Sequence, residues 1–132
     1  MLAVSCDVLH TDKDSIDGFW QLVAVDTLAT GTTTDMRESQ VTWAVQGSLL
    51  EVRIADSFME DFVFKFEHTS NSLKLLSPYQ IDRDHGDVKV VNVDLLRPFG
   101  INELEENFTL IQLSGSQLIL ESSLLRLHFR NY

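Results

Sequence analysis

The chain has 132 residues, a length typical of one domain that can bury a core without disulfides or metals. Its 10 basic and 20 acidic residues give a formal net charge of −10, which disfavours binding to nucleic acids and predicts a solvated acidic surface. One cysteine excludes an intramolecular disulfide, and no apolar run reaches the roughly 20 residues that a membrane-spanning helix needs.

The first residues predict an N-terminal tail, residues 1–15, ahead of one folded domain, residues 16–132. Small and apolar residues lead directly into Cys6, an order similar to the end of a bacterial lipoprotein signal, where such residues precede the lipidated cysteine. Ala3 stands where these signals usually carry leucine, and the basic and longer apolar segments of a full signal do not precede it. Cys6 is therefore a lipidation candidate, and a free cysteine in the tail is the alternative. A lipid there would tether the domain to a membrane surface without inserting the fold.

Short runs in which apolar and polar residues alternate predict a succession of β-strands. The bulky residues of 41–46 share one face, Gly47 and Ser48 form a turn, and residues 49–54 return as the second half of a hairpin. Three phenylalanines share one face of the strand predicted at 58–68. The other strands are predicted at residues 19–26, 73–76, 88–95, 108–113, 117–121 and 124–130.

The segments between these strands predict turns and loops. Residues 27–40 are rich in threonine and predict a long loop, and residues 79–87 predict an exposed charged loop. The Ser77–Pro78 pair is expected to end the strand before it. Residues 97–102 break the alternation, and residues 103–106 are compatible with one helical turn.

These strands number eight or nine, short turns join nearly all of them, and helical periodicity is almost absent. Each strand has one apolar face, and an antiparallel sheet of this kind can bury that face by curling until its edges meet. The sequence therefore predicts an all-β fold, a single antiparallel up-and-down barrel of about eight strands.

The motif Gly18-Phe19-Trp20 opens the first predicted strand and matches the G-x-W signature of lipocalins. The last three strands, which run to an aromatic end at Tyr132, resemble the closing strands of bacterial lipocalin-like domains. The chain therefore resembles this family over residues 16–132, which implies a lipocalin-like barrel.

The resemblance also implies how one barrel end closes. In lipocalins the tryptophan packs across this end against an arginine of the last strand, so Gly18, Trp20 and Arg130 are the expected closing residues. Arg126 is the alternative partner. The alternation of the last strand places both arginines on its outer face, so the contact needs a twist or bulge near the end of that strand.

The inward-facing residues are the remaining candidate site. The resemblance implies that they line a cavity for a small hydrophobic ligand, and the few polar groups expected inside, Gln112 or Tyr79, favour a lipid-like ligand over a sugar. A barrel filled by its own side chains is the alternative. If a ligand cavity exists, its mouth is expected at loops 27–40 and 79–87 or at segment 97–106. The predicted interior consists of Trp43, Val52, Phe62, Phe64, Phe66, Leu110, Leu120 and Phe129.

No catalytic or metal-binding motif accompanies these residues. The sequence contains no P-loop and no G-x-S-x-G, C-x-x-C or H-E-x-x-H pattern. Residues 82–87 resemble a calcium loop only loosely and lack its distal glutamate. We therefore expect no enzyme activity, no metal and no cofactor. The histidines lack close ligand spacing and are His10, His68, His85 and His128.

The sequence thus favours a non-enzymatic binding protein of the bacterial cell envelope. Its expected partner is a small apolar ligand, with no nucleic acid and with membrane contact only through a lipid anchor. The alternative is a filled-barrel module that offers its loops or the segment Pro98–Ile101 to a protein partner. An interior void favours the ligand, and an exposed Phe99 favours the protein partner. A cytoplasmic location stays open.

Overall fold

The computed structural model describes residues 15–55, 61–82, 84 and 86–132. Its helices are the 3₁₀ turns η1 (Arg37–Ser39), η2 (Val93–Leu95) and η3 (Arg97–Phe99), and no helix in this part of the chain is long and apolar enough to span a membrane. The strands are β1 (Gly18–Thr27), β2 (Thr32–Asp35), β3 (Val41–Gln46), β4 (Leu49–Ile54), β5 (Phe62–His68), β6 (Ser72–Gln80), β7 (Val88–Lys89), β8 (Glu106–Leu113), β9 (Gln117–Glu121) and β10 (Leu125–Asn131).

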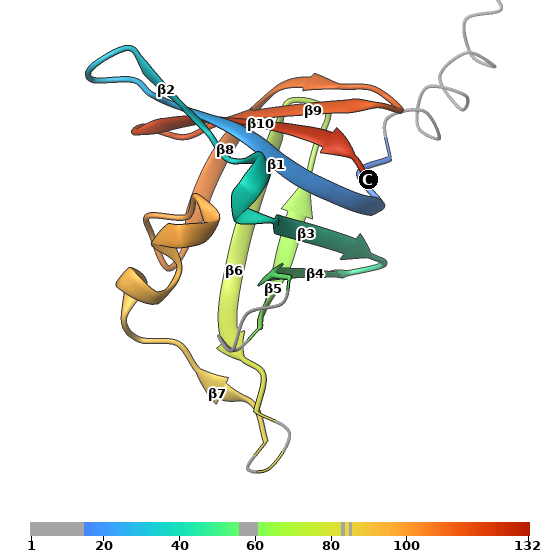
Figure 1. Cartoon of the computed structure of the whole chain (residues 1–132). Helices are drawn as coiled ribbons and strands as arrows, with labels where there is room; N and C mark the ends of the chain where they lie inside the picture. The colour runs from blue at the N-terminus through green and yellow to red at the C-terminus, as the bar shows by residue number, and fades with distance from the viewer. Residues whose placement is uncertain (1–14, 56–60, 83, 85) are drawn as a thin grey trace, which may run out of the picture.

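Eight of these strands form a closed antiparallel barrel. They follow one another around it in the order β1, β3, β4, β5, β6, β8, β9 and β10, and β10 pairs with β1 to close the ring. The other two strands add to this barrel, since β2 pairs with the second half of β1 and β7 pairs with the end of β6 (Figure 1). The predicted all-β, up-and-down barrel is confirmed.

Most predicted strands lie where the alternation placed them. The hairpin of β3 and β4 pairs Val41 with Ile54 and Gln46 with Leu49, around a turn at Gly47. Strand β9 also has its predicted bounds, and β1, β8 and β10 differ from theirs by one or two residues at an end. Of the strand predicted at 58–68, residues 58–60 lie outside the described part of the chain.

Strand β6 corrects one prediction, because it continues through Ser77 and Pro78 instead of ending there. Ser77 has a φ of 52°, and the pairing with β5 shifts register between Val63 and Lys65. A proline is tolerated in a sheet at such a bulge, where the ladder does not need its missing N–H, and a bulge also bends the strand around the barrel.

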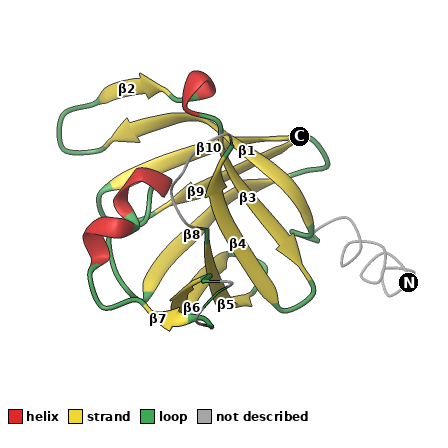
Figure 2. Cartoon of the chain, turned by 60° about the horizontal axis from the view of Figure 1, so that its bottom comes forward, coloured by secondary structure: helices red, strands yellow, loops and turns green. Residues whose placement is uncertain are grey.

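The segment between β6 and β8 corrects two further predictions. The apolar run at 88–95 forms a strand only at Val88–Lys89 and then turns into η2, and residues 103–105 are bends rather than a helical turn. The Asn92 side chain ends the extended run by accepting a hydrogen bond from the Asp94 amide, which starts η2. Figure 2 shows the short helical turns of this segment lying off the strands. Val90, Leu96, Phe99 and Ile101 of the segment are buried, whereas Val88, Val91 and Leu95 are exposed.

The core lies inside the barrel and is built from the inward positions of the strands. The Trp43 ring packs on Phe108 and Phe129, with ring centroids 5.8 and 4.8 Å apart. Of the predicted interior residues, Phe66 and Leu110 are half-buried. The other six are buried and are Trp43, Val52, Phe62, Phe64, Leu120 and Phe129.

Candidate functional site

One barrel end is closed by residues 90–101, which we call the plug. The Phe99 ring packs edge-to-face on Phe62 of β5, with ring centroids 5.6 Å apart. The adjacent Gly100 lies against Leu127 of β10 so closely that a Cβ at this position would be 2.9 Å from the nearest leucine methyl. Strands β5 and β10 are opposite one another in the ring of eight, so this part of the plug lies in the middle of the barrel.

The centre of the barrel is filled by side chains. A side chain that borders a space large enough for a water molecule has exposed surface there, even when the space is sealed. Leu50, Phe64, Leu120 and the plug residue Phe99 have no exposed surface at all. The predicted interior therefore packs as a core at this level, and the mouth expected at 97–106 is occupied by the chain itself.

The plug is a unit with its own hydrogen bonds. Backbone amides of η2 and η3 bond within the segment, and Arg97 Nε donates to Asp94 Oδ1 at 2.7 Å. The plug bonds to the barrel wall through the Val90 amide, which donates to the Pro78 carbonyl, and through Trp43 Nε1, which donates to the Phe99 carbonyl at 3.2 Å. This last bond satisfies a buried indole N–H and fixes the position of Phe99 along the barrel axis.

A buried carboxylate holds the chain where it leaves the plug. Glu106 begins β8 and is 5% exposed, and its Oε1 accepts a hydrogen bond from the Asn102 amide at 2.9 Å. Burial raises the pKa of Glu106 above its ordinary value, partly offset by this backbone bond. Glu106 therefore fixes the backbone at Asn102, directly after the plug.

The opposite barrel end, where the chain enters β1, contains a hollow of about 580 Å³. Its apolar wall is formed by half-buried residues of the strand ends, including the predicted Phe66 and Leu110. Sequence reasoning missed Ile16, an isolated apolar residue in a polar stretch, which is buried beside them. The full lining consists of Ser15, Ile16, Asp17, Gly47, Phe66, His68, Thr69, Ser70, Leu110, Ile111, Gln112 and Leu113.

The residues predicted to close this end are arranged differently from the expectation. Trp20 is buried, and its Nε1 donates to the Ile16 carbonyl at 2.8 Å. Gly18 has a φ of 137°, a backbone conformation that other residues rarely adopt, and a Cβ there would be 3.9 Å from Trp20 Nε1. Arg130 does not reach Trp20: it is exposed, lies opposite Gln21 in the ladder, and donates from Nε to Gln21 Oε1 at 2.8 Å. The alternation of β10 holds to its end, so the twist that the contact required is absent.

The two polar groups expected inside the barrel also lie outside it. Tyr79 is exposed on the outer wall beside Val63, and Gln112 is exposed and donates to Gln117 Oε1. The bulge at Ile111 explains why the Gln112 side chain lies outside the barrel, because the pairing of β8 with β9 shifts register there. The barrel centre thus lacks the side chains that would orient a polar ligand.

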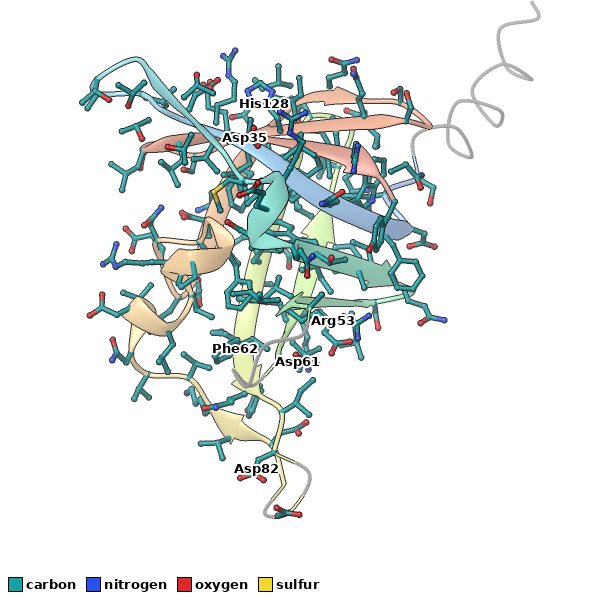
Figure 3. All side chains as sticks on the ribbon, in the orientation of Figure 1. Asp35, Arg53, Asp61, Phe62, Asp82 and His128 are labelled. Atoms are coloured by element: carbon teal, nitrogen blue, oxygen red, sulfur yellow. The ribbon has the colours of Figure 1, made fainter. Side chains whose placement is uncertain are left out.

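The outer wall carries the clearest acid–base pair, formed by Asp26 of β1 and His128 of β10. Figure 3 labels His128 on its strand. His128 Nε2 lies 2.8 Å from Asp26 Oδ2, and Thr33 of β2 donates to Asp26 Oδ1 at 2.7 Å. The hydrogen bonds from His128 and Thr33 hold the pKa of Asp26 below its usual range. The hollow of about 420 Å³ beside the pair is lined by no serine or cysteine that could act as a nucleophile. We therefore interpret these contacts as structural, since they join the β1–β2 hairpin to β10.

The remaining candidate residues add no metal centre or nucleophile. Among the described residues, no group of three or more histidine, cysteine, aspartate or glutamate side chains is placed to hold a metal ion. His68 lines the end hollow, and Asp82 and Asp84 belong to the charged loop. Cys6, His10 and His85 lie outside the described part of the chain.

Two kinds of comparison with known proteins agree with this geometry, one with protein families and one with solved structures. A family model described as a lipocalin-like domain matches residues 1–132. A lipocalin-like protein from Bacteroides uniformis superposes with a TM-score of 0.67 at 20% identity, covering 89% of this chain and 98% of its own. An uncharacterized protein from Bacteroides eggerthii superposes with a TM-score of 0.64 at 13% identity, and the match covers 89% of this chain and 100% of that protein. The sequence matches none of the curated proteins.

Proposed function

Because the chain belongs to the lipocalin-like domain family, we propose that it is a non-enzymatic binding domain that holds a small apolar molecule in the hollow at its N-terminal end. The single observation that carries the proposal is the hollow itself, which is walled by Phe66, Leu110 and Ile16 and opens between the strand ends. The family fold does not by itself specify a ligand, so the argument rests on this site.

The size and lining of the hollow suit a small ligand. Its volume of about 580 Å³ falls within the range of roughly 300–1,000 Å³ that is typical of small-molecule sites. The floor is apolar, while His68, Thr69 and Gln112 bring polar groups to its rim. Such a site holds an alkyl or aromatic body by burying its surface and orients one polar end at the rim.

The filled centre limits the depth of this site. A ligand at the N-terminal end meets Phe66 and Leu110 and then the packed layer of Phe64 and Leu120, which have no exposed surface. The ligand is therefore short or lies partly outside the barrel. Long chains threaded through the barrel are incompatible with the plug.

Native mass spectrometry of the protein purified from a bacterial host, with organic extraction, tests the proposal. We expect a co-purifying apolar molecule that Leu110→Gln removes and Leu125→Gln retains. The two leucines are a matched pair, since both are partly buried against the core, one at each barrel end. A ligand-free mass for the unmodified protein, with no thermal shift from fatty acids and sterols, would contradict the proposal.

The filled barrel favours one alternative, a protein-interaction module. The surface first expected for it is wrong, because Phe99 and Ile101 are buried in the plug instead of exposed. A ligand-free mass together with a stoichiometric protein partner would support this alternative. Lipidation of Cys6 and a cell-envelope location stay predictions from the sequence.

A further inference from the structure

Charge is distributed unevenly between the two barrel ends. The N-terminal end consists of residues 15–19, 44–49, 66–72, 110–117 and 130–132, which contain the start of β1, the end of β10 and three hairpin turns. Hydrogen bonds join these segments, from the Asn131 amide to the Ser116 carbonyl and from the Tyr132 amide to the Phe19 carbonyl. Figure 1 shows the start of β1, the C-terminus and the β3–β4 turn on one side of the molecule. In these segments the acidic residues are Asp17 and Glu67.

The plugged end carries most of the negative charge of the described residues. Acidic side chains follow the β1–β2 hairpin and η1, the loop after β6, and the plug with the bends that follow it. Asp35, Asp84, Asp94 and Glu105 are exposed examples. A chain with a net charge of −10 therefore has one acidic end and one end that is almost uncharged.

Large apolar side chains are exposed at both ends, and at the uncharged end four of them form a ring. Those of the acidic end stand among its charged loops and are Leu28, Val88, Val91, Leu95 and Leu124. Phe19, Leu49, Ile111 and Tyr132 are 55%, 48%, 44% and 76% exposed. They belong to β1, β4, β8 and the residue after β10, so they are spread around the barrel instead of gathered on one wall. Tyr132, Phe19 and Leu49 lie on one half of the barrel and Ile111 on the other, so a flat surface pressed against the end would meet all four.

We propose that this ring docks the barrel end-on to the surface of a lipid bilayer. Exposed tyrosine, phenylalanine and aliphatic side chains partition into the interface between headgroups and acyl chains. An anionic membrane surface repels the acidic end and lets the uncharged end approach.

The inference is independent of the proposed ligand, because it rests on the ring and on the charge distribution and not on the hollow. The two fit together physically. Ile111 belongs both to the ring and to the lining of the hollow, so a docked barrel opens its hollow toward the bilayer. An apolar molecule then passes between membrane and protein without crossing water.

Sedimentation with vesicles of phosphatidylcholine and phosphatidylglycerol tests the docking surface. Ile111 is 44% and Tyr132 76% exposed, so we expect Ile111→Ser combined with Tyr132→Ser to lower the partition coefficient about tenfold. The control combines Leu28→Ser with Leu124→Ser, exposed leucines of the acidic end, and is expected to change binding less than about twofold. Higher salt should not weaken the binding, because the attraction is apolar.

Hydrogen exchange with and without vesicles locates the bound surface without any substitution. We expect slower exchange at the turns after β3 and β8 and unchanged exchange at the β9–β10 turn. Three outcomes would overturn the inference: no vesicle binding by the unmodified protein, equal losses for the two double variants, or protection of the acidic end. An end-to-end dimer in sedimentation velocity that the ring variant abolishes would assign the ring to a second copy instead. Ligand extraction tests binding in the hollow, and vesicle sedimentation tests docking. Failure of one proposal can therefore be distinguished from failure of the other.

Discussion

The plug predicts a large loss of stability when Phe99 is replaced by alanine. The ring has no exposed surface and packs on Phe62 in the middle of the barrel. Transfer of a phenylalanine side chain out of such surroundings costs about 1.5–3 kcal/mol, and the void that remains raises the loss in free energy of unfolding to about 3–5 kcal/mol. For a domain of ordinary stability, about 5–15 kcal/mol, this loss is a large fraction of the total.

Equilibrium unfolding in urea, followed by tryptophan fluorescence, measures this loss. Phe66→Ala is the control, because the same ring is only half-buried at the opposite barrel end, and its loss should be less than half as large. Toluene supplies a second readout. A dry apolar void of this kind binds small aromatic molecules, so toluene should raise the unfolding midpoint of Phe99→Ala and leave that of the unmodified protein unchanged.

Three results would refute the reasoning. A loss below about 1 kcal/mol for Phe99→Ala would mean that the ring does not fill the barrel centre in solution. Equal losses for Phe99→Ala and Phe66→Ala would mean that depth in the barrel does not decide the cost. Stabilisation of the unmodified protein by toluene would mean that the centre already contains a void.

Two other substitutions test the contacts of the plug. Gly100→Ala should lower the free energy of unfolding by about 2–4 kcal/mol, because φ is 87° and the new Cβ would be 2.9 Å from a Leu127 methyl. Gly47→Ala is the control, because φ is 62° there but no atom beyond its chain neighbours lies within 4 Å of the new Cβ. Its loss in the same urea titration should be about 1 kcal/mol. Burial raises the pKa of Glu106, so its charge costs stability above that pKa and the cost disappears as the pH falls through it. Glu106→Gln keeps an acceptor for the Asn102 amide, so the variant should be at least as stable as the unmodified protein at neutral pH. The difference in free energy of unfolding between the two proteins should disappear as the pH is lowered. A difference in urea midpoint that instead grows on acidification would contradict this.

The barrel could be predicted because its signals are local. A strand with one wet and one dry face alternates with a period of two, and β3, β4 and β9 show this pattern with turn residues at their ends. The same pattern is shared by β-sandwiches and barrels, because both cover the apolar face of each strand, and the resemblance to lipocalins favoured the barrel. The G-x-W motif at Gly18 then indicated the family, and the family comparison confirms it.

The plug could not be predicted because its signals are long-range. The run at 88–95 is apolar enough for a strand, and periodicity does not distinguish a strand from an irregular segment that is buried on all sides. What makes it a plug is the fit of Gly100 against Leu127 and of Phe99 against Phe62, which no spacing in the sequence records. The positions of Phe66 and Leu110 in a hollow depend in turn on which barrel end the plug occupies.

The plug also decides where function is to be sought in this barrel. An eight-stranded barrel has an interior that holds either packed side chains or one small ligand, and here Phe99 and the residues around it fill the centre from one end. That same end carries the acidic loops, so it is both closed and repelled by anionic surfaces. The remaining hollow lies at the other end, among uncharged turns and exposed aromatic side chains. The proposed ligand site and the proposed docking surface therefore both lie at the N-terminal end. Substitutions at Leu110 or Ile111 should change these functions, whereas matched substitutions at Leu125 or Leu124 should not.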